Sequence, residues 1–439
     1  MVVVFVLVAL LMVGVLVTAN WYVWRRLFRD TTRAPGPVRR IGAVVIAGGW
    51  LLAVGALVAE RTGAPFWLQR VLAWPGFLWL ALSIYLLLAV VAGEVVRPLL
   101  RMLLERRAAA RHTEDAQPSV SPAADTSRIP AGTAPPKASE ASEAPEPPGT
   151  PGPGPEDAST SPLALPSRRL FVSRVVAGAA AAAAVGTVGY GTYGVLNGPS
   201  VKRVTVPLAR LPRAAHGFRI AVVSDIHLGP VLGRGFAQKV VDTINSTQPD
   251  LIAVVGDLVD GSVKDLGPAA APLAQLKARH GAYFVTGNHE YFSGAEQWVA
   301  EVRRLGLIPL ENARTELPHF DLAGVNDVAG EDEGQGPDYD RALGDRDRSR
   351  ACVLLAHQPV QIHDAVDHGV DLQLSGHTHG GQLWPGNLIA GAANPTLAGL
   401  ERYGDTQLYV SRGAGAWGPP TRVGAPSDIT VIQLASRQA

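Results

Sequence analysis

The stretch Arg219-Ile-Ala-Val-Val-Ser-Asp225-Ile-His227 decides the fold of the C-terminal half of the chain. It is a short apolar run that ends in an aspartate and a histidine. Continuous apolar runs of this length are typical of buried central strands. In α/β domains, ligand sites open at the carboxyl ends of such strands. The stretch therefore predicts a strand that delivers Asp225 and His227 to a site.

Four later segments repeat this pattern of an apolar run followed by polar side chains. They are residues 251–255, 282–285, 352–356 and 371–374. Helical candidates lie between them at residues 236–245, 269–279 and 295–305. Alternating strands and helices predict an α/β domain, in which polar groups beyond several strand ends gather at one edge.

Five short motifs follow these runs in order. They are Ser-Asp225-Ile-His227, Gly-Asp257, Gly-Asn288-His289-Glu290, Ala-His357-Gln-Pro and Gly-His377-Thr-His379. Their oxygen and nitrogen donors suit Zn, Mn or Fe, and the single cysteine, Cys352, excludes a thiolate-rich site. Two such ions about 3.5–4 Å apart can clamp the attacking and leaving oxygens of a phosphoryl transfer. The motifs thus predict a hydrolase that acts on a phosphate ester or anhydride.

The five motifs resemble the signature of the calcineurin-like metallophosphoesterase superfamily. That signature reads Asp-x-His, Gly-Asp-x-x-Asp, Gly-Asn-His-Glu/Asp, an isolated His and Gly-His-x-His. Here the second box is Gly256-Asp257-Leu-Val-Asp260, and every box is intact. The resemblance covers roughly residues 207–434. It implies a four-layer α/β/β/α sandwich, preceded here by an N-terminal transmembrane helical region.

The resemblance also implies roles for the motif residues. A first divalent ion would be held by Asp225, His227, Asp257 and His379, and a second by Asp257, Asn288, His357 and His377. Asp257 would be the bridging carboxylate, and a metal-bound hydroxide would be the nucleophile. His289 would face the scissile phosphate as the catalytic acid or charge stabiliser. Either Glu290 or Asp260 could orient its ring.

Residues 1–105 predict a membrane region with three helices. The apolar stretches 2–24, 43–59 and 71–96 are candidates to cross a hydrocarbon core, the second being the shortest. Six of the nine tryptophans fall here, several near the ends of these stretches. Arginines are concentrated in residues 25–40 and 97–111, whereas the connection between the second and third stretches has only Arg61 and Arg70. The positive-inside rule then predicts an extracellular N-terminus.

The remaining segments complete the predicted layout. Residues 106–167 are rich in Pro, Ala and Ser, and we expect a disordered linker. Residues 168–198 begin with Arg168-Arg169-Leu-Phe-Val and continue with an alanine-rich apolar run. This segment predicts either a fourth transmembrane helix or a twin-arginine-like signal in mid-chain. Both interpretations place the metallophosphoesterase domain, residues 199–439, outside the cytoplasm on a multi-pass cell-membrane protein.

The charge distribution and two segments near the last motif bear on the substrate. The formal net charge of +1, with cations concentrated at membrane flanks, argues against nucleic acid as a partner. The Gly-Gly-Gln382 extension and the segment 410–415 resemble a membrane-anchored bacterial branch of phosphodiesterases and UDP-2,3-diacylglucosamine pyrophosphatase-like proteins. This suggests a phosphodiester or pyrophosphate of a lipid or cell-envelope precursor, with Arg412 as a candidate substrate-binding residue. A phosphatase of soluble phosphomonoesters and a non-catalytic membrane sensor or scaffold remain alternatives.

Overall fold

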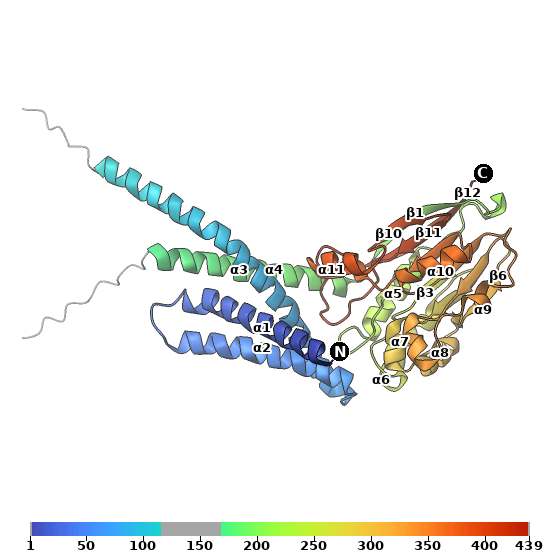
Figure 1. The fold of residues 1–439 in the computed structure, drawn as a ribbon, viewed down its shortest axis with the longest axis horizontal. Coiled ribbons are helices and arrows are strands. Elements are labelled where there is room, and N and C mark those ends of the chain that lie inside the picture. Colours follow the sequence, from blue (N-terminus) through green and yellow to red (C-terminus); the bar gives the residue numbers. More distant parts are fainter. Residues whose placement is uncertain (1, 116–167, 438–439) are drawn as a thin grey trace, which may run out of the picture.

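The computed structural model describes residues 2–115 and 168–437 (Figure 1). A group of long helices projects from one side of an α/β domain. The helices are α1 (Val2–Trp24), α2 (Pro37–Arg61), α3 (Phe66–Asp115) and α4 (Arg168–Asn197). Each is long and apolar enough to cross a membrane, as their composition predicts.

Helix α3 is longer than the sequence predicts. It contains Pro75 and Pro98 and runs to Asp115, into the stretch expected to be linker. The rest of that stretch, residues 116–167, lies outside the described residues. Helix α4 packs along α3, where Ala184 and Val188 meet Ala81 and Tyr85 in one buried cluster. The fourth apolar helix is therefore an integral part of the helical group.

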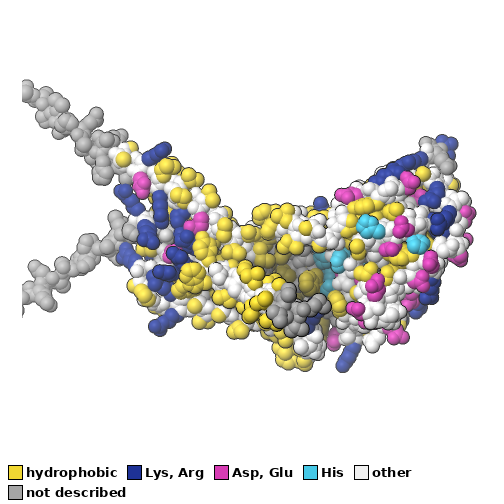
Figure 2. Space-filling model, in the orientation of Figure 1, with side chains coloured by type: hydrophobic (Ala, Val, Ile, Leu, Met, Phe, Trp, Pro, Cys, Tyr) yellow, Lys and Arg dark blue, Asp and Glu magenta, His cyan; other side chains and the backbone are white. Residues whose placement is uncertain are grey.

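The charged ends of the helices lie away from the α/β domain. Figure 2 shows the Lys and Arg side chains gathered at the far end, and hydrophobic side chains along the middle of the helices. Arginines from α3, α4 and the π-helical turn Arg25–Arg29 meet there around one hollow. The helical group thus has a basic end and an opposite end that contacts the α/β domain.

The α/β domain is built on two six-stranded sheets. The first has the order β1-β12-β2-β3-β4-β5 and the second β10-β11-β9-β8-β7-β6. The first sheet comprises β1 (Ser200–Leu208), β2 (Arg219–Val223), β3 (Leu251–Val255), β4 (Ala282–Val285), β5 (Ile308–Pro309) and β12 (Asp428–Ser436). The second comprises β6 (Ala313–Glu316), β7 (Asp321–Gly324), β8 (Cys352–Leu355), β9 (Leu372–Ser375), β10 (Gly399–Tyr403) and β11 (Thr406–Val410). Most pairings are parallel; β12 with β2, β10 with β11, and β6 with β7 are antiparallel.

Alternate residues of the strands point to opposite faces and so create four layers. One buried cluster lies between the sheets and joins Val222 and Val255 to Leu355 and Leu374. A second cluster packs the outer face of the first sheet against helices α5 (Arg234–Ser246), α6 (Val263–Ala270) and α8 (Ala295–Arg304). A third packs the outer face of the second sheet against α9 (Tyr339–Leu343) and α10 (Ile362–Asp367). The predicted α/β/β/α sandwich is confirmed.

One predicted helix differs from the structure. The segment 269–279, expected to be helical, contains only the last turn of α6 and the 3-10 helix Ala271–Gln275. Pro272 lies in the first turn of that 3-10 helix, where proline is tolerated, and it ends the α-helix because it lacks a backbone N–H donor. The other two predicted helices correspond to α5 and α8.

Candidate metal centre

The five motifs lie directly after the carboxyl ends of five strands. Strands β2, β3 and β4 of the first sheet lead into Asp225, Asp257 and Asn288, and strands β8 and β9 of the second lead into His357 and His377. Because the sheets face each other, the loops of both sheets meet at one edge of the sandwich. The predicted convergence therefore involves both sheets.

The backbone of the motifs is held in an uncommon conformation. Five of the motif residues have positive φ angles between 48° and 72°: Asp225, His227, Asp257, His377 and His379. Left-handed backbone is uncommon for residues other than glycine and persists when the surroundings enforce it. The motif glycines provide the necessary space. A Cβ on Gly287, for example, would collide with the Asp257 carboxylate.

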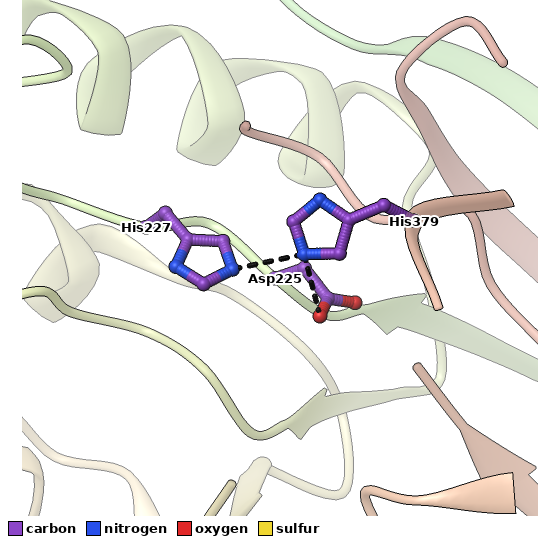
Figure 3. Close-up of side chains that lie close together, drawn as sticks. All are labelled: Asp225, His227 and His379. Carbon is purple, nitrogen blue, oxygen red and sulfur yellow. Dashed lines mark hydrogen bonds and ion pairs between the residues drawn. The ribbon is translucent and has the colours of Figure 1, made fainter. Parts of the chain in front are cut away.

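Asp225, His227 and His379 form the first donor cluster (Figure 3). The Nε2 atoms of His227 and His379 are 3.0 Å apart, and Nε2 of His379 is 3.3 Å from Oδ1 of Asp225. The backbone N–H of His377 donates to the Asp225 carboxylate and orients it. Three buried donor atoms thus point toward one another from two segments, the loops after β2 and β9.

Asp257, His357 and His377 form the second cluster. Oδ2 of Asp257 is 3.1 Å from Nε2 of His357 and 3.8 Å from Nε2 of His227. Oδ1 of Asn288 is 3.0 Å from Nδ1 of His377. Asp257 therefore lies between the two clusters, the position that the family resemblance implies for a bridging carboxylate.

The ring nitrogens of the histidines suit metal binding. His357 donates its Nδ1 hydrogen to the Val255 carbonyl at 2.8 Å, which leaves Nε2 unprotonated when the ring is neutral. That Nε2 is buried and lies 3.1 Å from Oδ2 of Asp257, inside the second cluster. His379 donates from Nδ1 to Oε1 of Gln382 at 2.8 Å, so its Nε2 also faces the cluster. Outer partners of this kind fix the ring and tautomer of metal-binding histidines. The residues present therefore fit divalent metal ions.

Glu290 supports the loop that carries Asp257. Its buried carboxylate accepts hydrogen bonds from the backbone N–H groups of Asp257, Leu258 and Gly287, at 2.9, 2.8 and 2.6 Å. Burial and the nearby Asp257 charge raise the pKa of Glu290 to about 7. Burial would raise the pKa of Asp257 as well, but the His357 charge and hydrogen bond lower it well below its ordinary value.

His289 stands beside His227 of the first cluster and is oriented by Asp260. Oδ1 of Asp260 is 2.7 Å from Nδ1 of His289 and 2.9 Å from Nδ1 of His227. Burial would lower the pKa of His289, but the hydrogen bond and charge of Asp260 raise it to about 9. The alternative that the sequence left open is thus resolved in favour of Asp260, because Glu290 is occupied with backbone groups.

The donors open into a pocket of about 890 Å³, whose lining includes Asp257, Asn288, His289, His377 and His379. Phe292 and Trp417 approach the His289 ring edge-on, with centroids 5.6 and 5.7 Å away. These two aromatic residues escaped the sequence analysis because neither lies in a motif.

Two arginines near the centre differ in role. Arg412 does not line the pocket, and its side chain passes over Gly380. Arg422, which the sequence analysis missed, is buried and donates to the carbonyl oxygens of His379, Gly415 and Ala425. Arg422 therefore ties the last metal motif to the loop after β11. No sequence signal separates it from a surface arginine.

Comparison with known proteins agrees with this geometry. The profile of the calcineurin-like phosphoesterase family matches residues 218–381. An uncharacterized metallophosphoesterase of Helicobacter pylori is 37% identical over 62% of this chain and 73% of its own length. The chain belongs to the calcineurin-like metallophosphoesterases.

Two further relatives extend the comparison. A metallophosphoesterase of Bacillus subtilis is 31% identical over 62% of this chain and 98% of its own length. A Danio rerio protein named "Transmembrane protein with metallophosphoesterase domain" is 38% identical over 55% of this chain. The match spans about six tenths of that relative, 59% of its length. The name of this relative joins the same two features, apolar helices and a metallophosphoesterase domain.

Proposed function

We propose that this chain is a membrane-anchored, metal-dependent phosphohydrolase that cleaves a phosphodiester or pyrophosphate through a dinuclear centre. The observation that carries the proposal is the position of Asp257 between two donor clusters. A carboxylate that lies between two sets of imidazoles suits a pair of ions about 3.5–4 Å apart. Membership of the metallophosphoesterase family supports the same reaction class.

The side chains have complementary roles in this proposal. Asp225, His227 and His379 would hold one ion, Asn288, His357 and His377 would hold the other, and Asp257 would contribute to both. Bound divalent ions polarise phosphoryl oxygens and activate water. His289, protonated and held by Asp260, faces the pocket and donates a proton to the leaving oxygen.

The proposed substrate class rests on the side of the membrane on which the α/β domain lies. The basic end of the helices is opposite the α/β domain, which by the positive-inside rule supports a location of the domain outside the cytoplasm. The packing of α4 against α3 favours an anchored fourth helix over a cleaved twin-arginine signal. A site at the outer membrane surface favours a lipid or cell-envelope precursor, as in the UDP-2,3-diacylglucosamine pyrophosphatase-like branch, over a soluble nucleotide.

The reaction is tested with purified full-length protein, bis-p-nitrophenyl phosphate and Mn, Fe or Zn ions. We expect metal-dependent release of p-nitrophenol that Asp257→Asn abolishes. Wild-type rates equal to those of Asp257→Asn with all three metals would favour the non-catalytic sensor instead.

The orientation is tested separately by thiol labelling in intact cells. Cys352 is buried, so a cysteine placed at the exposed Asp405 provides a clean target. A membrane-impermeant maleimide should label Asp405→Cys in intact cells. Labelling that requires lysis would contradict the external location.

A further inference from the structure

The pocket over the metal-site residues is partly walled by the membrane helices. Arg61, the last residue of α2, and Leu80 and Ile84 of α3 line it together with His289 and His377. The catalytic domain alone would leave this side of the pocket open. A phosphate group needs only a small part of a pocket of about 890 Å³, whose size is that of sites for larger ligands.

Helix α11 (Gly386–Ala393) also lines the pocket and contributes Ile389, Ala390 and Ala393. Figure 1 shows α11 on the face of the domain turned toward the membrane helices. Leu388 and Ile389 are 68% and 77% exposed, and Trp384 just before the helix is 52% exposed. Exposed apolar patches of this kind mark interaction sites, and beside transmembrane helices they suit the lipid interface.

The wall formed by α3 is fixed to the domain by specific contacts. The Tyr85 hydroxyl donates to the Trp384 carbonyl at 2.9 Å. Leu383 and Val423 of the domain pack against the buried cluster that contains Ala81 and Tyr85. Ile84 is the immediate neighbour of Tyr85, so its position relative to the metal-site residues is set by these contacts.

Arg61 adds a cation to the same pocket. Its guanidinium carbon lies 5.5 Å from the centre of the Phe292 ring, which in turn borders His289. Within residues 2–115 and 168–437, the Arg61 side chain makes no hydrogen bond or salt bridge. Arginine binds phosphate oxygens through its planar pair of donors.

We propose that the membrane helices form one wall of the substrate site, and that this site takes an amphiphilic phosphoester from the outer leaflet. Arg61 binds the phosphate, while the passage between Ile84 of α3 and Ile389 of α11 holds the apolar tail. The inference rests on the proposed phosphohydrolase function and assigns the residues that select its substrate.

The test uses one reactive bond with tails of different length. Full-length protein in detergent is given methyl, butyl, octyl and dodecyl p-nitrophenyl phosphate below their micellar concentrations, and kcat/KM is measured from p-nitrophenol release. Each buried methylene is worth about 0.8 kcal/mol, or roughly fourfold in affinity. We expect kcat/KM to rise by at least about tenfold from the butyl to the octyl ester.

Variants then test which residues contact the apolar tail and which bind the phosphate. Ile84→Trp should fill the passage and remove the gain in kcat/KM between the butyl and the octyl ester. Arg61→Gln should lower kcat/KM for all four esters by a similar factor of about ten. The matched control is Val91→Trp, which is on α3 but exposed and about 10 Å further along the helix. It should behave as wild type.

The possible outcomes distinguish the inference about the substrate site from the proposed phosphohydrolase function. Equal rates for all tail lengths, or an unchanged tail-length profile in Ile84→Trp, would overturn the inference while the phosphohydrolase function stands. Failure to hydrolyse even the methyl ester with any metal would overturn both. Ile84→Ala removes side-chain volume and is the control for a folding defect caused by substitution at this position. It should keep the higher kcat/KM for longer tails.

Discussion

Oδ1 of Asp260 lies 2.7 Å from Nδ1 of His289. The same oxygen also accepts a hydrogen bond from His227. One carboxylate thus positions both His227, a proposed metal ligand, and His289, the proposed acid. A His–carboxylate pair of this kind raises the basicity of the ring.

Asp260→Asn should therefore shift the pH profile of the enzyme. Removing the carboxylate charge lowers the pKa of His289 from its raised value of about 9. Protonated His289 is present below its pKa, so the decline of kcat at alkaline pH should begin at lower pH. We expect kcat to fall by about 10–100-fold at neutral pH. Steady-state kinetics across pH 5–10 measure both effects. Asp405→Asn, at a fully exposed position, is the control.

Gln382→Ala should weaken metal binding. Gln382 accepts the Nδ1 hydrogen of His379 at 2.8 Å and donates to the carbonyl oxygen of Trp417. Loss of such an outer partner typically costs about 10–100-fold in metal affinity or activity. Titration of the metal-stripped protein with Mn²⁺ measures the change. Gln297→Ala, exposed on α8, should leave the affinity unchanged.

Glu290→Gln should mainly lower the free energy of unfolding, with a smaller effect on activity. The carboxylate accepts three backbone hydrogen bonds, and an amide would turn its NH₂ group toward at least one N–H donor. A buried donor left without an acceptor costs about 1–3 kcal/mol. Chemical denaturation of the full-length protein in detergent should show this loss. A midpoint identical to that of the exposed Glu296→Gln control would contradict the role of Glu290.

Cys352 should be inert in the folded protein. Burial raises the pKa of its thiol to about 12, and the reactive thiolate is therefore scarce at neutral pH. We expect no reaction with Ellman's reagent until denaturant is added, and then one thiol per chain. Rapid modification of the native protein would show that β8 opens in solution.

The sequence predicted the centre of the fold better than its edges. Strands β2, β3 and β4 are continuous apolar runs because both faces are buried, so their composition indicates them directly. β1 and β6 alternate or are polar, because one side of each strand is exposed at a sheet edge. The partition of the strands into two facing sheets came from the family resemblance, since pairing across sheets leaves no local trace.

The candidate site likewise contains residues that the sequence predicts and residues that it does not. The motif residues were predictable because metal chemistry requires particular side chains at fixed spacing. Arg61, Leu80 and Ile84 were not, because they enter the pocket from membrane helices that no local pattern links to the motifs. Arg422 and Gln382 act through hydrogen bonds to the His379 segment, and such support depends on the folded geometry.

The central claim is that two metal ions share Asp257. Elemental analysis of active, full-length protein, paired with activity on bis-p-nitrophenyl phosphate, tests it most directly. We predict about two Mn, Fe or Zn ions per chain in the wild type, with fewer ions and activity reduced to background in Asp257→Asn. Active protein without a transition metal, or an Asp257→Asn variant that retains both its metal content and its turnover, would contradict the account.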